Sequence, residues 1–140
     1  MKKIYFDMDG TIADFYGVDG WLDSILKRET KPYREAKPLI NMRRFGKEIK
    51  RLQKIGYSVG IISWLAKGST QEYDAKVQKT KIKWLQHHLG SVQFDEIHLV
   101  KYGTPKYMFG DGILFDDEER NRKEWSCRNS ENLAFDVNNI

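Results

Sequence analysis

Short apolar runs alternate along the chain with stretches in which apolar residues recur at helical spacing. The first run, residues 2–6, is rich in β-branched and aromatic side chains and ends at a turn, which predicts a short buried strand. Residues 57–63 are apolar on both faces, which is typical of a central parallel strand. We expect three further strands at residues 97–100, 112–115 and 132–137.

Two helices with an apolar stripe are expected between these strands. The first is defined by apolar residues three and four positions apart, which are Phe45, Ile49, Leu52 and Ile55. The second is expected over residues 70–89, and its core stripe is Ile82, Leu85 and Leu89. Strands that alternate with helices in this way indicate an α/β fold with a mostly parallel sheet.

Residues 12–41 follow neither pattern, apart from a short helical stretch at about residues 21–28. A chain of 140 residues is typical of one domain, and the sequence contains no repeat and no Gly/Ser-rich linker. We therefore expect a single domain over residues 1–140, with residues 12–41 as a small cap or lid insertion.

Composition excludes several classes of protein. The single cysteine, Cys127, rules out an internal disulfide and a multi-cysteine zinc site. The longest apolar stretch, residues 59–66, is too short to span a membrane, and the apolar run after Lys2-Lys3 is too short for a signal peptide. We expect a cytoplasmic protein without a membrane partner, and no obligate protein partner is evident.

The charge balance favours an anionic ligand weakly. The chain has 24 Lys and Arg against 20 Asp and Glu, a net charge of +4. Basic residues cluster on the polar side of the first predicted helix, at Arg43, Arg44, Lys47, Lys50, Arg51 and Lys54. We interpret them as a solvated helix face, with a nucleic-acid-binding stripe as the alternative.

The candidate chemistry begins with Asp7-Met8-Asp9-Gly10-Thr11, directly after the first predicted strand. Ligands of open parallel sheets bind beyond the carboxyl ends of the strands. Asp7 and Asp9 can share a side if the extended backbone continues, and their mutual repulsion is relieved by a hard cation such as Mg²⁺. The structural alternative is a turn or helix cap, since Asp, Gly and Thr all suit turns.

A second acidic pair, Asp116-Asp117, follows the predicted strand at residues 112–115. A cation shared between the two strand ends would neutralise carboxylates that are otherwise costly to bury. Alone, this pair would be an acidic helix start. Ser63 ends residues 57–63, where its hydroxyl could donate to a phosphate oxygen or simply cap a helix.

These positions resemble the motifs of the haloacid dehalogenase superfamily of phosphotransferases, and the resemblance covers residues 2–126. The segment from Asp7 to Thr11 is similar to the first motif, Ser63 to the second and Asp116-Asp117 to the fourth. Lys106, ten residues before Asp116, fits the third motif. Weaker candidates for that lysine are Lys101 and then Lys81 or Lys83.

The resemblance implies a Rossmann-like three-layer α/β/α sandwich with a mostly parallel sheet and a very small cap insertion. The spacing Lys-x9-Asp-Asp and the segment Gly112–Asp117 are similar to the 5'(3')-deoxyribonucleotidase group. The implied activity is a phosphatase with Asp7 as the nucleophile and Asp9 as the general acid and base. Ser63 and Lys106 would bind the phosphoryl oxygens.

The implied cofactor is Mg²⁺, although Mn²⁺ could serve in use. Its ligands would be Asp7, the backbone carbonyl of Asp9, and Asp116 or Asp117. A nearby carboxylate at Asp9 argues for phosphoryl transfer to water, because the resemblance assigns that position to phosphatases and mutases.

The short cap would leave the site open to substrate. Thr11 is a candidate substrate contact. Several aromatic residues are also candidates, because they could stack on a base, with core packing as the alternative. These aromatic residues are Phe15, Tyr16, Trp21, Tyr33 and Trp64. The leading hypothesis is a phosphatase of nucleoside monophosphates, and the first alternative is a polynucleotide end phosphatase. A non-catalytic nucleotide-binding protein on the same fold is the third hypothesis.

The remaining reactive or aromatic residues are interpreted as non-catalytic. His87 and His88 are adjacent and would point about 100° apart on a helix, so they cannot chelate one metal together. His98 lies within a predicted strand, and Cys127 lacks an evident base partner. Trp84 and Trp125 are expected in the core.

Overall fold

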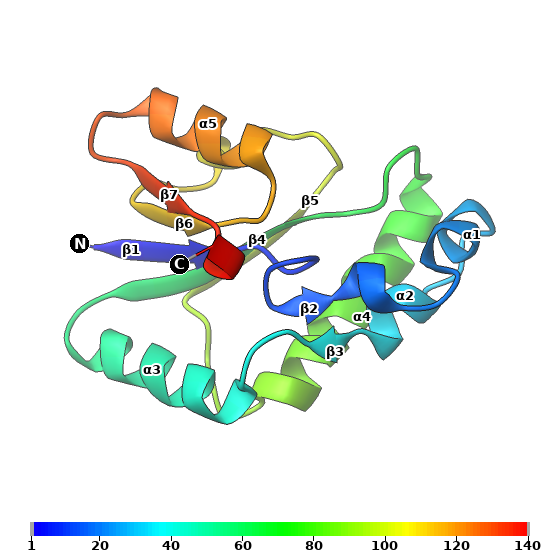
Figure 1. The fold of residues 1–140 in the computed structure, drawn as a ribbon, viewed down its shortest axis with the longest axis horizontal. Helices are drawn as coiled ribbons and strands as arrows, with labels where there is room; N and C mark the ends of the chain where they lie inside the picture. The colour runs from blue at the N-terminus through cyan, green and yellow to red at the C-terminus, as the bar shows by residue number, and fades with distance from the viewer. Residues whose placement is uncertain (1, 140) are drawn as a thin grey trace.

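A five-stranded parallel sheet forms the centre of the computed structural model, which describes residues 2–139 (Figure 1). Its strands are β1 (Lys3–Phe6), β4 (Ser58–Trp64), β5 (Glu96–Val100), β6 (Ile113–Phe115) and β7 (Leu133–Phe135). Their order is β5-β4-β1-β6-β7, and every neighbouring pair is parallel. The α/β fold class and the five predicted strands are confirmed, with ends that shift by one or two residues.

Helices cover both faces of this sheet. Helix α3 (Met42–Lys54) and helix α4 (Gln71–Leu89) pack on one face, and helix α5 (Glu119–Arg128) lies on the other with the short helix η2 (Lys106–Met108). This is the expected three-layer arrangement, visible in Figure 1 with α3 and α5 on opposite sides of the sheet. No helix within residues 2–139 has the length and apolar character needed to cross a membrane.

Alternation of side chains along β1 builds the two core layers. Ile4 and Phe6 face the α3–α4 layer with Trp84, whereas Tyr5 faces the α5 layer with Trp125. Trp84 and Trp125 are buried, as expected. The indole N–H of each tryptophan donates to a backbone carbonyl, so its polar group is satisfied inside the core.

The buried face of α4 differs from the predicted stripe. Ile82, expected in the core, is 40% exposed. Leu85 and Leu89 are buried as predicted, and the full set of buried positions is Tyr73, Val77, Lys81, Trp84, Leu85 and Leu89. This stripe follows four-residue steps through residues 73, 77, 81 and 85, and it contains a lysine. Ile82 follows Lys81 directly and points about 100° away from it around the helix, so it lies beside the buried stripe rather than within it.

Helix α3 has the expected amphipathic character. Ile49 is buried, and all the basic residues of the cluster defined above are exposed. Ile55, expected on the apolar face, lies just past the helix end and is 61% exposed. The solvated-face interpretation is consistent with this arrangement.

The segment of residues 12–41 is more ordered than its pattern indicates. It contains β2 (Ala13–Asp14), η1 (Phe15–Gly17), α1 (Trp21–Leu26), α2 (Lys31–Glu35) and β3 (Lys37–Pro38). Only α1 was expected. Strands β2 and β3 pair antiparallel but have only two residues each, and α2 has five. These elements are too short to show periodicity in the sequence. Helix α2 packs against α4, beside the carboxyl ends of the sheet strands (Figure 1).

Candidate active site

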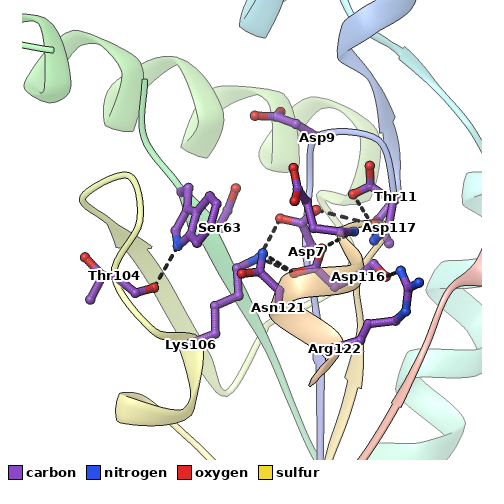
Figure 2. Close-up of polar contacts among 12 residues, drawn as sticks. Asp7, Asp9, Thr11, Ser63, Thr104, Lys106, Asp116, Asp117, Asn121 and Arg122 are labelled. Carbon is purple, nitrogen blue, oxygen red and sulfur yellow. Dashed lines mark hydrogen bonds and ion pairs between the residues drawn. The ribbon is translucent and has the colours of Figure 1, made fainter. Parts of the chain in front are cut away.

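Two carboxylates lie at the carboxyl ends of adjacent strands. The N–H of Asp7 donates to the carbonyl of Phe115 at 2.9 Å, and the N–H of Asp116 donates to the carbonyl of Phe135 at 3.0 Å. The sheet ladder therefore continues one residue beyond β1 and β6 and fixes both side chains at one edge. Oxygens of Asp7, Asp116 and Asp117 lie within 4.8 Å of one another (Figure 2).

The loop after β1 passes closely over this acidic group. Gly10 has φ +84°, and a Cβ atom there would lie 2.3 Å from Oδ2 of Asp117, so only glycine fits. The Thr11 hydroxyl lies 3.3 Å from oxygens of both Asp7 and Asp117 and accepts from the N–H of Asp117 at 3.2 Å. Thr11 is fully buried and ties the two acidic segments together.

Lys106 bridges the two strand ends. Its Nζ lies 2.8 Å from Oδ1 of Asp7 and 2.6 Å from Oδ2 of Asp116 (Figure 2). Burial opposes the charge of this ammonium, but Asp7 and Asp116 outweigh burial and raise the pKa of Lys106. The alternatives Lys101 and Lys83 are exposed. Of the expected third-motif lysines, the structure thus brings Lys106 to the acidic group.

Lys81 also reaches the site, although the sequence ranked it low. Its Nζ, from the buried face of α4, lies 2.7 Å from Oγ of Ser63 and 3.0 Å from Oδ2 of Asp9. A lysine four residues after Val77 and four before Leu85 was the signal, because a charged side chain on a core stripe needs a partner.

The carboxylate of Asp9 lies apart from the three-carboxylate group. It pairs with Lys81 of α4. Asp7 pairs with Lys106, and Figure 2 shows the carboxylate of Asp9 apart from this pair. Asp7 and Asp9 therefore do not form one side-chain pair, because the backbone leaves the extended conformation at Met8, whose carbonyl accepts from the N–H groups of residues 11–13. This placement leaves the expected metal ligands unchanged, because Asp9 was expected to bind the ion through its backbone carbonyl and not through its carboxylate.

Two residues of α5 hold Asp116 and were not singled out in the sequence. The side-chain amide of Asn121 donates to Oδ2 of Asp116 at 3.1 Å, and Arg122 donates to the Asp116 carbonyl at 3.0 Å. The N–H of Glu118 donates to Oδ1 of Asp116 at 2.9 Å. The only signal in the sequence was that Asn121 is a polar residue in the first helical turn after the acidic pair.

The acidic residues are poorly compensated without a cation. Burial, followed by repulsion from Asp7, raises the pKa of Asp116 to about 6 and that of Asp117 to about 8. Burial also raises the pKa of Asp9, against the effect of Lys81. Four carboxylates face two ammonium groups, so the ionised site carries two excess negative charges. An all-oxygen group with this excess fits a hard divalent cation such as Mg²⁺.

A pocket of about 230 Å³ opens beside these charges. Asp7, Asp9 and Lys106 contribute to its lining. The aromatic residues that line it are Phe15, Tyr16, Trp21, Tyr33, Trp64 and Tyr102. Five of them were candidates in the sequence. Tyr102 was missed, because it follows β5 in a loop without a recognisable pattern.

The aromatic side chains form two walls. Trp64 donates to the carbonyl of Thr104 at 2.8 Å, and its ring lies 4.7 Å from the ring of Tyr102. Tyr16 and Trp21 meet edge to face at 5.1 Å on the other wall. Tyr16 is 49% exposed, so its ring is not committed to the core.

The histidines and the cysteine have other surroundings. His98 contacts Glu96 at 2.8 Å, and the ring of His88 lies 4.4 Å from that of Trp84. Cys127 is exposed on α5. The pocket lining does not include these residues.

Comparison with known proteins gives a structural likeness only. No family model and no curated protein matches the sequence. The fold is similar to that of a D,D-heptose 1,7-bisphosphate phosphatase from Burkholderia thailandensis, with a TM-score of 0.56, 15% identity, and coverage of 91% of this chain and 73% of that one. The fold is also similar to that of a D,D-heptose 1,7-bisphosphate phosphatase from B. bronchiseptica, which was solved with magnesium and phosphate. The TM-score is 0.53 and the identity 15%, with coverage of 89% of this chain and 74% of that one. At this identity the likeness establishes the fold.

Proposed function

We propose that this protein is a Mg²⁺-dependent phosphomonoester hydrolase that works through a phosphorylated Asp7, as the haloacid dehalogenase resemblance implies. The observation that supports it best is the group of Asp7, Asp116 and Asp117 at adjacent strand ends, bridged by buried Lys106. The structural neighbours are phosphatases, and one was solved with magnesium and phosphate. Because a fold hosts many activities, the proposal rests on the site.

The first step is attack by a carboxylate oxygen of Asp7 on phosphorus. The bond from Asp7 to phosphorus forms while the bond to the leaving oxygen breaks, and the electron pair leaves with that oxygen. Asp9 supplies the proton that the leaving alkoxide needs. Lys106 uses two of its three N–H donors on Asp7 and Asp116, so one donor is left for a phosphoryl oxygen.

The second step returns the enzyme to its starting state. Asp9, now ionised, takes a proton from a water molecule, and the water oxygen attacks phosphorus. The bond to Asp7 breaks, and inorganic phosphate and a free carboxylate result. Ser63 would donate to a phosphoryl oxygen in both steps.

The residues that would hold Mg²⁺ are Asp7, the backbone carbonyl of Asp9, and Asp116 or Asp117. When bound, the ion offsets the negative charge of the carboxylates and of the phosphoryl group, which otherwise repel each other. Thr11 and Asn121 would orient the carboxylates from behind.

The proposed substrate is a nucleoside monophosphate. The pocket of about 230 Å³ that continues from Asp7 is lined by six aromatic side chains, which suit the flat face of a base better than a polar sugar. We further propose that residues 12–41 are a small cap, because Tyr16, Trp21 and Tyr33 provide one wall of this pocket. The names of the structural neighbours suggest the contrasting prediction, which is a sugar phosphate as the substrate.

A second candidate is a polynucleotide end phosphatase. The observation that favours it is the row of exposed basic side chains on α3, since no acidic partner is recorded for most of them among the described residues. Such a row would add attraction for a phosphate backbone, with a steep dependence on salt concentration.

The test is phosphate release from a panel of phosphomonoesters with Mg²⁺ and with EDTA. The panel contains ribo- and deoxyribonucleotides, sugar phosphates, and oligonucleotides with 5'- or 3'-phosphates. We expect Mg²⁺-dependent release, fastest from a mononucleotide. Asp7→Asn should reduce it at least about 10³-fold, since it removes the nucleophile. Asp111→Asn, at an exposed carboxylate outside the site, is the matched control.

Each other outcome assigns a different function. Faster release from oligonucleotide ends, with a steep salt response, supports the second candidate. A preference for sugar phosphates refutes the nucleotide assignment and keeps the hydrolase. No release from any substrate by folded protein refutes the hydrolase and favours a non-catalytic nucleotide-binding protein.

A further inference from the structure

Lys81 is a deeply buried charged residue beside the site, and the proposed mechanism gives it no role. Its side chain is 1% exposed on the core face of α4. Burying an ammonium group is costly unless it is paired and hydrogen-bonded. A methionine or leucine would fill the same helix position without that cost, so the lysine calls for an explanation.

All three N–H donors of Lys81 are used by groups that belong to the site. Nζ lies 2.7 Å from Oγ of Ser63, 2.7 Å from the carbonyl oxygen of Trp64 and 3.0 Å from Oδ2 of Asp9 (Figure 2 shows Ser63 and Asp9). The ring of Tyr33 lies over Nζ, with its centroid 5.2 Å away. Lys81 therefore has no donor left for a phosphoryl oxygen, in contrast to Lys106.

The direction of these hydrogen bonds constrains the hydroxyl proton of Ser63. An ammonium group can only donate, so Oγ of Ser63 must accept from Lys81. The hydroxyl proton is then free to point to another acceptor, and a phosphoryl oxygen bound beside Asp7 would be such an acceptor. Lys81 thus sets Ser63 as a donor towards the substrate.

The same argument applies to Asp9. Lys81 occupies Oδ2, which leaves Oδ1 as the oxygen that exchanges a proton with the leaving group and with water. The contact with Lys81 also fixes the direction of the Asp9 side chain. One ammonium group therefore orients both the acid–base residue and the phosphate-binding hydroxyl.

We propose that Lys81 is a positioning residue that orients Ser63 and Asp9 for phosphoryl transfer, without contacting the substrate. This inference rests on the proposed function, since it assigns Lys81 to the same reaction. Its distinctive consequence concerns the leaving group. A nucleotide releases an alkoxide that needs a proton from Asp9, whereas p-nitrophenyl phosphate releases a phenolate that leaves without one.

The experiment compares kcat/KM on these two substrates for Lys81→Met, which keeps an unbranched side chain one atom shorter and removes its donors. The value of kcat/KM reports the steps up to phosphoryl transfer to Asp7. We expect a loss of about 10²-fold on the nucleotide, the lower range for a general acid, and about 10-fold on p-nitrophenyl phosphate. Lys79→Met, at an exposed lysine of the same helix, is the control and should leave both values unchanged.

A second variant covers the case in which Lys81→Met does not fold. Lys81→Arg keeps the positive charge, but a planar guanidinium cannot place three donors where the ammonium has them. It should show the same larger loss on the nucleotide. Circular dichroism and thermal unfolding establish folding for each variant.

The outcomes separate this inference from the proposed function. Equal losses on the two substrates, or no loss, in an active enzyme overturn the role of Lys81 and leave the hydrolase standing. If neither variant folds, Lys81 is a structural residue and the inference also fails. If the folded wild-type protein releases phosphate neither from these two substrates nor from any member of the phosphomonoester panel, both proposals fail.

Discussion

Raising the pH should destabilise the metal-free protein, because its buried carboxylates are forced to ionise together. The pKa of Asp117 is raised to about 8 and that of Asp116 to about 6, whereas an unfolded aspartate titrates near a pKa of about 4. Between these values the folded state binds more protons than the unfolded state. The stabilising effect of protonation is complete below pH 4 and is lost as the pH rises through 6 and then 8.

The expected magnitude follows from proton linkage. Where the folded state binds one more proton than the unfolded state, each unit of rise in pH lowers the free energy of unfolding by about 1.4 kcal/mol. Above pH 6 the main contribution with a known range is that of Asp117, which is partly exposed, so screening reduces the mean slope to about 1 kcal/mol per pH unit or less. For a chain of this size, this corresponds to a fall in Tm of about 3 °C per pH unit.

The assay is thermal unfolding from pH 6 to pH 8 in EDTA and in excess Mg²⁺. Mg²⁺ should remove the fall in Tm, and at about 100 times its Kd it adds about 2.7 kcal/mol. Other groups act in the opposite direction. The net charge of +4 decreases with pH, and burial lowers the pKa of His88, so both raise stability in this range.

Asp117→Asn should flatten the slope, whereas Asp111→Asn, at an exposed carboxylate, should leave it unchanged. A metal-free Tm that rises with pH, or a slope that Asp117→Asn does not alter, would refute the argument that this carboxylate is held protonated in the folded protein.

Two further predictions concern the packing behind the site. Gly10→Ala should cost about 1–3 kcal/mol and weaken Mg²⁺ binding, because its Cβ would lie 2.3 Å from Asp117, whereas Gly68→Ala, with a similar φ and no atom within 4 Å, should cost only its backbone strain. Calorimetric Mg²⁺ titrations and thermal unfolding of both variants check this, and equal Mg²⁺ affinities would contradict it. Trp125→Phe should destabilise by about 1–3 kcal/mol, because the smaller ring leaves a gap in the core and the carbonyl of Gly112 loses its indole donor and keeps the N–H of Leu133, and denaturant unfolding measures the loss.

The strands of the sheet were predictable because each strand carries its signal locally, whereas their order in the sheet was not predicted. Residues 57–63 are apolar on both faces, and the structure pairs β4 on both sides in the sheet. The secondary structure of residues 12–41 was not predictable, apart from α1, because β2 and β3 are two residues long and are defined by pairing between residues 13–14 and 37–38. A pair of this kind depends on tertiary contacts rather than on periodicity.

The candidate site was predictable where its residues follow strands. Asp7, Ser63 and Asp116 lie at strand ends, so sheet topology alone brings them to one edge. Lys81 and Asn121 lie on helices, and nothing in their local sequence shows which part of the sheet they face. Their positions depend on how α4 and α5 pack, which the apolar pattern alone does not specify.

The two buried lysines divide the site into two charge systems. Lys106 pairs with the carboxylates that follow β1 and β6, and Lys81 pairs with Asp9 and Ser63 on the α4 side. Each lysine offsets one negative charge, so Asp7, Asp116 and Asp117 together still exceed their compensation by two. A site balanced by its own side chains would have little affinity for a cation. The uncompensated charge therefore lowers the stability of the metal-free protein and, for the same reason, provides the attraction for Mg²⁺ that the proposed reaction requires.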